Sequence, residues 1–157
     1  MPEMPLSVRP VDFADARDVA IYLDLLDAYA RDPMGADSPL PADVRERLPR
    51  DLAVHPGVHC LIAELHGTPV GMATCFAGYS TFRALPLLNI HDIAVLPEWR
   101  GRSVAQRLLA EIVDLGRRLG CCRITLEVRD DNPRARRLYE RAGFIPSTCS
   151  LFMEKPL

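Results

Sequence analysis

The chain has 157 residues, of which 48% are hydrophobic and 25% charged, and its net charge at pH 7 is −2. This length and composition are those of one ordinary globular domain, and they exclude disordered, collagen-like and coiled-coil chains. The apolar runs are shorter than the ~20 residues of a membrane span, and the first residues lack the regions of a signal peptide. We therefore expect a single domain over residues 1–157, in the cytoplasm and without a membrane partner.

The first half of the chain predicts two helices followed by strands. Residues 8–10 read as a short extended segment, and Asp15 is a helix N-cap from which apolar residues recur at helical spacing to about Tyr29. A second, short helix is predicted from Pro41 to about Leu48. Three strands are predicted next, the first two joined by a Gly-containing hairpin turn, over residues 58–64, 70–76 and 87–95.

The second half alternates helices and strands. The predicted elements are a helix over residues 103–119, a strand over 122–128, a helix over 132–142 and a final strand over 144–153. The order β-α-α-β-β-β-α-β-α-β predicts an α/β fold of the α+β type, in which helices cover the faces of a mixed sheet.

The cysteines and histidines carry no disulfide or metal-binding pattern. The five cysteines are odd in number and lack Cys-x-x-Cys spacing, and Cys121 and Cys122 are adjacent. A Pro-Gly pair separates His55 from His59, so these imidazoles would not share a helix face. We therefore predict no metal site, and buried cysteines that act as small hydrophobic side chains.

Charge is divided unevenly along the chain. Residues 1–95 carry a net charge of −6 and residues 96–157 a net charge of +4. Charge alone favours two solvated surfaces of unlike sign, although an anionic ligand held by the second half would need the same pattern. Nucleic-acid binding through residues 129–141 is a weaker alternative, because acidic residues interrupt that basic run. We expect no nucleic-acid partner.

The turn after the predicted strand at residues 87–95 has the features of an anion site. It reads Arg-Gly-Arg-Ser-Val-Ala over residues 100–105 and leads directly into a helix. The first N–H groups of a helix lack intrahelical partners and lie at its positive end, where phosphate binds well. The turn is neither Gly-x-Gly-x-x-Gly nor a P-loop, which argues against dinucleotide and triphosphate ligands.

This turn and the helix after it resemble two motifs of the GNAT superfamily of acyl-CoA-dependent N-acyltransferases. The first motif, Arg/Gln-x-x-Gly-x-Gly/Ala, is matched over residues 100–105 with Ser103 in place of the first Gly. The second, Asn-x-x-Ala-x-x-Leu-Tyr-x-x-x-Gly-Phe, is complete over residues 132–144. The resemblance implies the GNAT fold, a mostly antiparallel sheet of six to seven strands with about four helices. It also implies acetyl-CoA as cosubstrate and a homodimer.

The resemblance also implies which residues bind the coenzyme. The backbone of one strand end would pair with the pantetheine arm like an added strand, at Ile93, Ala94 and Val95. The turn and the helix start would hold the pyrophosphate, with Arg100, Gly101, Arg102, Ser103, Val104, Ala105 and Gln106. The other side would be formed by Asn132, Arg134, Ala135 and Tyr139. The Ser103 hydroxyl would either donate to a phosphate or cap the helix.

By the same resemblance, a neutral amine attacks the acetyl thioester directly in a ternary complex. Tyr139 would protonate the leaving thiolate, because a phenol of pKa ~10 stays protonated at neutral pH. Asp92 and His91 are both candidates for the base. They come directly before residues 93–95, and this stretch looks similar to spermidine/spermine acetyltransferases, in which a Glu-Asp pair comes directly before Phe-Phe-Val. In a regular strand these two side chains would point to opposite faces, whereas the bulge usual in GNAT proteins would bring them together.

The acceptor is expected at the loops 31–40 and 78–87. Met34, Tyr79 and Phe82 would wall its alkyl part, while Asp92, with Asp32 or Asp37, would attract its charge. With the acidic first half, these residues favour a small cationic amine as substrate. The competing hypothesis is a non-catalytic module that binds acyl-CoA or a protein partner.

Overall fold

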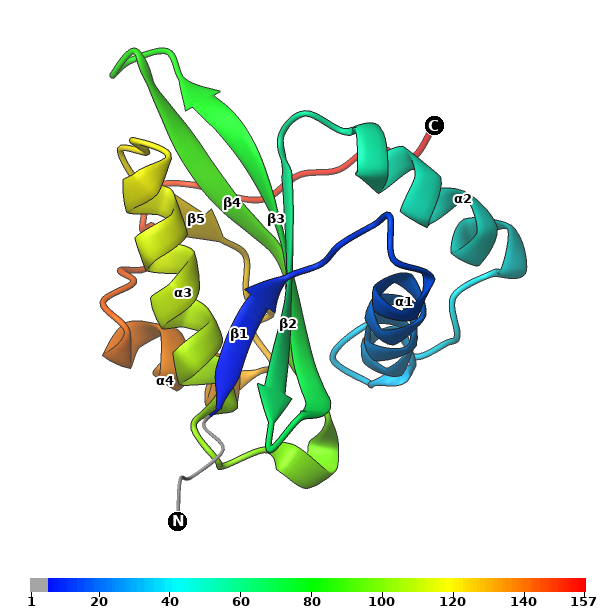
Figure 1. Cartoon of the computed structure of the whole chain (residues 1–157). Helices are drawn as coiled ribbons and strands as arrows, with labels where there is room; N and C mark the ends of the chain where they lie inside the picture. Colours follow the sequence, from blue (N-terminus) through cyan, green and yellow to red (C-terminus); the bar gives the residue numbers. More distant parts are fainter. Residues whose placement is uncertain (1–5) are drawn as a thin grey trace.

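A computed structural model describes residues 6–157 as one mixed sheet with helices on both faces (Figure 1). The strands lie in the order β1-β2-β3-β4-β5, with bounds Ser7–Pro10, Val58–Leu65, Thr68–Ser80, Leu85–Val95 and Ile124–Leu126. Neighbouring strands are antiparallel, except that β4 and β5 are parallel. The helices are α1 (Ala16–Arg31), α2 (Ala42–Val54), α3 (Val104–Arg118) and α4 (Pro133–Arg141), with a 3-10 turn at Pro97–Trp99.

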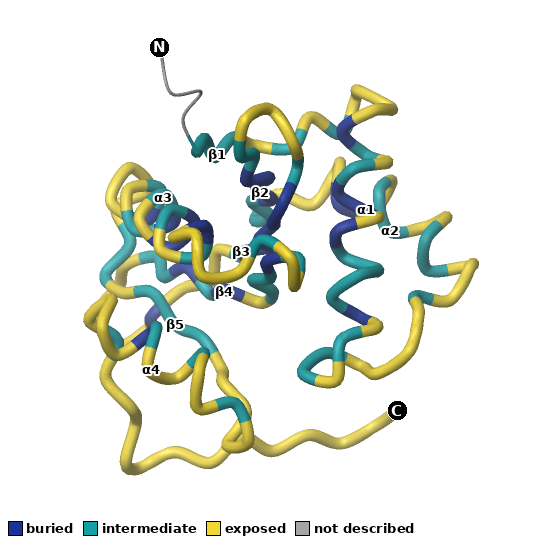
Figure 2. Tube along the Cα trace, turned by 90° about the horizontal axis from the view of Figure 1, so that it is seen from below, coloured by how far each residue is buried: buried dark blue, intermediate teal, exposed yellow. Residues whose placement is uncertain are grey.

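Each face of the sheet has its own apolar core, as the burial pattern in Figure 2 shows. On one face, the stripe of α3 packs on the sheet with its fully buried residues Leu108 and Ile112. On the other face, Tyr22 of α1 and Leu52 of α2 pack on Ile62 of β2. The predicted α/β class with a mixed sheet is confirmed.

Two predicted elements differ from the structure. The second helix runs to Val54 rather than to about Leu48 and contains Pro49, although a proline there removes one backbone hydrogen bond and its ring crowds the carbonyl of Arg45. The final strand expected over residues 144–153 does not form, so the sheet has five strands and not six to seven. A strand needs a hydrogen-bonding partner, and no backbone hydrogen bond within residues 6–157 involves residues 145–157.

Strand β4 is irregular where the sheet meets the second half of the chain. Thr74 of β3 pairs with Asp92, whereas its neighbour Cys75 pairs with Ile90, so His91 is the extra residue of a β-bulge. The pairing of β4 with β5 is confined to Leu88–Ile90. Beyond Ile90, β4 therefore has a strand partner only on its β3 side, and its other edge is open.

Candidate functional site

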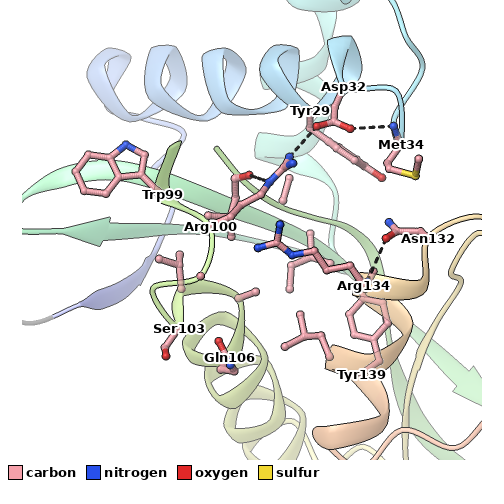
Figure 3. A pocket seen from close by; sticks show the side chains of 18 of the residues that line it. Tyr29, Asp32, Met34, Trp99, Arg100, Ser103, Gln106, Asn132, Arg134 and Tyr139 are labelled. Carbon is pink, nitrogen blue, oxygen red and sulfur yellow. Dashed lines mark hydrogen bonds and ion pairs between the residues drawn. The ribbon is translucent and has the colours of Figure 1, made fainter. Parts of the chain in front are cut away.

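A cavity of about 360 Å³ lies beside this open edge of β4 (Figure 3). Its walls are the end of β4, the start of α3, the helix α4 and the end of α1. Such a volume is within the range of small-molecule and cofactor sites. Thirteen of the fourteen residues expected at the coenzyme line it, namely Ile93, Ala94, Val95, Arg100, Gly101, Ser103, Val104, Ala105, Gln106, Asn132, Arg134, Ala135 and Tyr139.

The start of α3 gives the cavity a polar end. The first backbone bond into α3 is donated by Arg107 to the carbonyl of Ser103, so the N–H groups of residues 104–106 have no partner in the described chain. Ser103 itself has φ +62° and ψ +12°, a left-handed conformation, and its side chain makes no capping hydrogen bond. The helix-cap role considered for this serine is therefore absent, and its backbone strain shows why the motif has Gly at this position.

The arginines of the cavity differ in their partners. Arg100 donates to the Asp32 carboxylate over 2.7 Å and to the carbonyl of Val95 over 3.0 Å, so its guanidinium is already paired. Arg134 points into the cavity toward Arg100 (Figure 3) and makes no ion pair in the described residues. Arg141 also lines the cavity without such a pair. The cavity thus has uncompensated positive charge beside free helix N–H groups, which favours an anionic ligand.

Tyr139 is held by α4 at the inner wall of the cavity. The Asn132 side chain caps α4 by accepting from the Ala135 N–H at 3.1 Å, and the ring of Tyr139 packs edge-on to Phe144. Tyr139 is 9% exposed, and burial, with a smaller contribution from Tyr29, raises its pKa to about 12. Its hydroxyl therefore remains a proton donor throughout the neutral and moderately alkaline range.

His91 and Asp92 do not line the cavity but lie at the bulge of β4, next to the cavity residue Ile93. The bulge brings both to the α1/α2 face. The His91 ring packs edge-on to Phe76 of the α1/α2 core at 5.6 Å, and Asp92 pairs with Thr74.

Burial raises the pKa of Asp92 above its ordinary value, and the charge of His91 and the Thr74 side chain offset part of this rise. The Thr74 hydroxyl in turn makes a buried hydrogen bond of 2.7 Å with the Tyr22 hydroxyl of α1. A pKa raised by burial is a common property of carboxylates that act as general bases.

Besides His91 and Asp92, three more residues predicted at the site lie outside the cavity. Arg102 is outside the cavity, with its guanidinium 5.0 Å from the centre of the Trp99 ring. Tyr79 and Phe82 belong to the hairpin that joins β3 to β4 and are 62% and 103% exposed, so they wall no cavity. Phe82 lies in the turn itself, where no neighbouring element can cover it. Met34 does line the cavity.

Sequence reasoning missed Tyr29 and the partner of Asp32. The pattern places Tyr29 at the end of the apolar stripe of the first helix, whereas its ring lines the cavity (Figure 3). Burial, followed by the charges of Asp92 and Asp32, raises the pKa of Tyr29. Asp32, one of the two carboxylates (Asp32 or Asp37) predicted to attract an amine, forms an ion pair with Arg100 and accepts from the Met34 N–H. No sequence signal joins residues 32 and 100, which are far apart along the chain.

Two general features concern the described residues as a whole. Within residues 6–157, no group of three or more His, Cys, Asp and Glu side chains is arranged to hold a metal ion. In the same range, no helix combines the length and the apolar character that crossing a membrane requires.

Comparison with known sequences finds acetyltransferases. The sequence model of the acetyltransferase (GNAT) family matches residues 22–144. Thialysine N-epsilon-acetyltransferase of Bos taurus is 31% identical over 96 residues, which make up 56% of this chain and 56% of the bovine protein. The protein of the same name from Mus musculus is 29% identical over 97 residues, or 57% of this chain and 56% of the murine one. The match thus spans about half the length of these curated relatives.

Comparison with solved structures finds the same fold. The aminoglycoside acetyltransferase meta-AAC0020 from an uncultured soil metagenomic sample, in complex with sisomicin, has a TM-score of 0.80 and 16% identity. The match covers 97% of this chain and 96% of that one. The aminoglycoside N-acetyltransferase AAC(6')-Iy, in complex with CoA, has a TM-score of 0.79 and 19% identity, covering 100% and 99% of the two chains. At these identities the likeness concerns the fold.

Proposed function

The chain belongs to the acetyltransferase (GNAT) family, and from this premise we propose that it transfers an acetyl group from acetyl-CoA to a primary amine, best a small cationic one. The observation that carries the proposal is the cavity, which combines an open strand edge, free helix N–H groups and a buried tyrosine. Because the curated relatives are matched over only about half their length, their activities enter here only as support.

The residues of the cavity fit the chemical parts of acetyl-CoA. The open edge of β4 at residues 93–95 suits the amide groups of the pantetheine arm, as an added strand would. The N–H groups of residues 104–106 and the guanidinium of Arg134 suit the pyrophosphate. Arg100 is paired with Asp32, so it acts here by holding the end of α1 against β4.

The proposed chemistry is direct attack of a neutral amine on the thioester carbonyl. Tyr139 lies at the cavity wall, and with its pKa near 12 it keeps the proton that it donates to the sulfur of the departing thiolate. Asp92 or His91, at the bulge beside Ile93, takes the proton of the incoming ammonium, directly or through water. No covalent enzyme intermediate is needed in this scheme.

The acceptor is proposed to approach β4 from the side that carries α1 and α2. Asp92, His91 and Tyr29 offer a carboxylate, an imidazole and an aromatic ring there, which suit an alkyl ammonium. Relatives named for thialysine and for aminoglycosides, both compounds with cationic amines, support this substrate class. We also propose that the enzyme is cytoplasmic and works as a homodimer.

Substitution of Tyr139 by Phe tests the function. We expect titration calorimetry to give the same acetyl-CoA affinity for wild type and Tyr139→Phe, since the phenol oxygen is not part of the anion site. With an amine panel, we expect thiol release by the variant to fall by about 10²-fold or more. Equal turnover by the two proteins would remove Tyr139 from the mechanism. If wild type binds acetyl-CoA but acetylates no amine of the panel, the binding-module hypothesis replaces the enzyme.

A further inference from the structure

Lys155 is the one lysine of the chain, and the other 18 of its 19 basic residues are arginines. An arginine side chain is no acceptor for an acetyl group, because its guanidinium does not lose its proton in a protein. A lysine side chain ends in a primary amine on an alkyl stem, which is the class of acceptor proposed above. The side chains of this protein therefore include a single primary amine that the proposed chemistry could acetylate.

Lys155 lies in a tail, residues 145–157, that begins beside the proposed acid. The residue before the tail, Phe144, packs its ring edge-on to Tyr139, with 6.0 Å between the ring centres. All residues of the tail are exposed, and its only hydrogen bonds in the described chain are side-chain bonds within residues 147–150. No hydrogen bond within residues 6–157 therefore holds Lys155 in one place.

The tail runs toward the side from which the acceptor is proposed to approach. In both views it leaves α4, passes the outer side of β5 and extends toward the side of the sheet that carries α1 and α2 (Figures 1 and 2). Asp92 and His91, the two candidates for the base, lie on the same side. Both helices belong to the first 95 residues, whose net charge of −6 attracts an ammonium group.

The tail is long enough to bring its lysine back to the cavity. Lys155 is 11 residues beyond Phe144, which is fixed next to Tyr139. A chain of this length spans up to roughly 36–40 Å, whereas a domain of this size has a radius of gyration of about 15 Å. An amine tethered in this way reaches an effective concentration on the order of millimolar at the site.

We propose that Lys155 is acetylated by the protein's own site, an inference that rests on the function proposed above. The neutral Nζ attacks the thioester carbonyl of acetyl-CoA, so an N–C bond forms and the C–S bond breaks. The lysine ammonium gives up two protons in all. One passes through Asp92 or His91 to solvent, and the other balances the proton that Tyr139 donates to the sulfur. The products are Nε-acetyllysine and the free thiol of CoA, and the reaction ends at one acetyl group per chain.

The number of acetyl groups on the full chain tests the proposal. After incubation with acetyl-CoA, we expect intact-mass spectrometry to show one acetyl group and peptide mapping to place it on Lys155. The rate constant should not change with protein concentration, because the amine is tethered. In Tyr139→Phe the acetylation should be slower by about 10²-fold, as for other amines. Lys155→Arg should gain no acetyl group and should still acetylate the amine panel.

The matched control moves the lysine to the opposite face of the sheet. In the double variant Lys155→Arg, Arg117→Lys, the introduced lysine lies on α3, where the side chain of Arg117 is 76% exposed, and it should stay unmodified. Acetylation at this position, or equal rates in wild type and Tyr139→Phe, would show that acetyl-CoA modifies lysines without the site and would overturn the proposal.

The amine panel separates failure of this proposal from failure of the proposed function. An unmodified Lys155 in a protein that acetylates amines of the panel overturns self-acetylation and leaves the function standing. If neither Lys155 nor any amine of the panel is acetylated, both proposals are wrong.

Discussion

The Arg100 guanidinium donates to the Asp32 carboxylate over 2.7 Å and thereby ties the end of α1 to the turn that follows β4. The same side chain donates to the carbonyl of Val95. The proposed acceptor side and the proposed coenzyme side of the cavity are therefore held together by one side chain. Arg100, for which the resemblance implies a coenzyme contact, thus also joins two elements of the fold.

The ion pair between Arg100 and Asp32 should contribute to the free energy of unfolding at neutral pH and less in acid. Arg100 holds the pKa of Asp32 below its usual range, so the pair stabilises the fold above about pH 4 and loses its effect as pH falls through the lowered value. We expect Asp32→Asn to lower the free energy of unfolding at pH 7 by up to about 1 kcal/mol, because the pair is partly exposed. Urea titrations at pH 7 and pH 3 should show a smaller difference at pH 3 than at pH 7, because the effect decreases once the pH is below the unfolded pKa. Asp51→Asn, at an exposed carboxyl on α2, is the control and should match wild type at both pH values.

The left-handed backbone at Ser103 predicts that glycine stabilises the chain there. We expect Ser103→Gly to gain about 0.5–1 kcal/mol and to raise Tm by roughly 1–4 °C. Gly101 has φ +79° and nothing within 4 Å of an added Cβ, so Gly101→Ala should lose about 1 kcal/mol through its backbone alone. Differential scanning calorimetry measures both changes, and a destabilised Ser103→Gly would contradict the strain.

The same glycine variant decides between two roles of the serine in coenzyme binding. If the serine affects coenzyme binding only through its Cβ, titration calorimetry at one ionic strength should show that Ser103→Gly binds acetyl-CoA as tightly as wild type, or more tightly. If the hydroxyl donates to a phosphate, the affinity of Ser103→Gly should fall by roughly tenfold, as expected for one charge-assisted hydrogen bond. We expect the first result, because a left-handed residue without a cap bond is strained already in the free protein.

The protonation state of Tyr139 predicts a spectroscopic result. Burial raises its pKa to about 12, above the ordinary value of about 10, so it stays neutral where exposed tyrosines ionise. Absorbance of tyrosinate near 295 nm should therefore rise identically in wild type and Tyr139→Phe up to about pH 11. An additional chromophore in wild type that titrates near pH 10 would show that the ring is solvated and would weaken its assignment as the acid.

The buried contact between Tyr22 and Thr74 predicts an effect on the base. Thr74 favours the ionised form of Asp92, so Thr74→Val should raise the pKa of this carboxyl further. If Asp92 is the base, the acid limb of the kcat/KM profile then moves to higher pH, whereas Thr74→Ser keeps the hydroxyl and the wild-type profile.

Loss of a hydrogen-bond partner for the Tyr22 hydroxyl should also cost Thr74→Val about 1–2 kcal/mol of stability. An unmoved acid limb in a folded Thr74→Val protein would point to His91 as the base instead.

Sequence alone determined most elements of the fold and the wall of the cavity. Helix and strand periodicity is local, and the two motifs place an anion site and a tyrosine at fixed distances along one chain segment. For this reason the helix start at Ser103, the cap at Asn132 and the helix end at Gly143 were predictable. The bulge could be expected only from the resemblance, because strand alternation by itself puts His91 and Asp92 on opposite faces.

Tertiary structure alone decided which distant residues meet. The pairing of Arg100 with Asp32, the place of Tyr29 in the cavity and the exposure of Phe82 depend on how α1 and the β3–β4 hairpin pack against the second half. The last predicted strand also depended on tertiary structure. Residues 144–153 have strand propensity, but a strand forms only where the edge of another strand supplies hydrogen bonds. In the described chain no strand pairs with these residues.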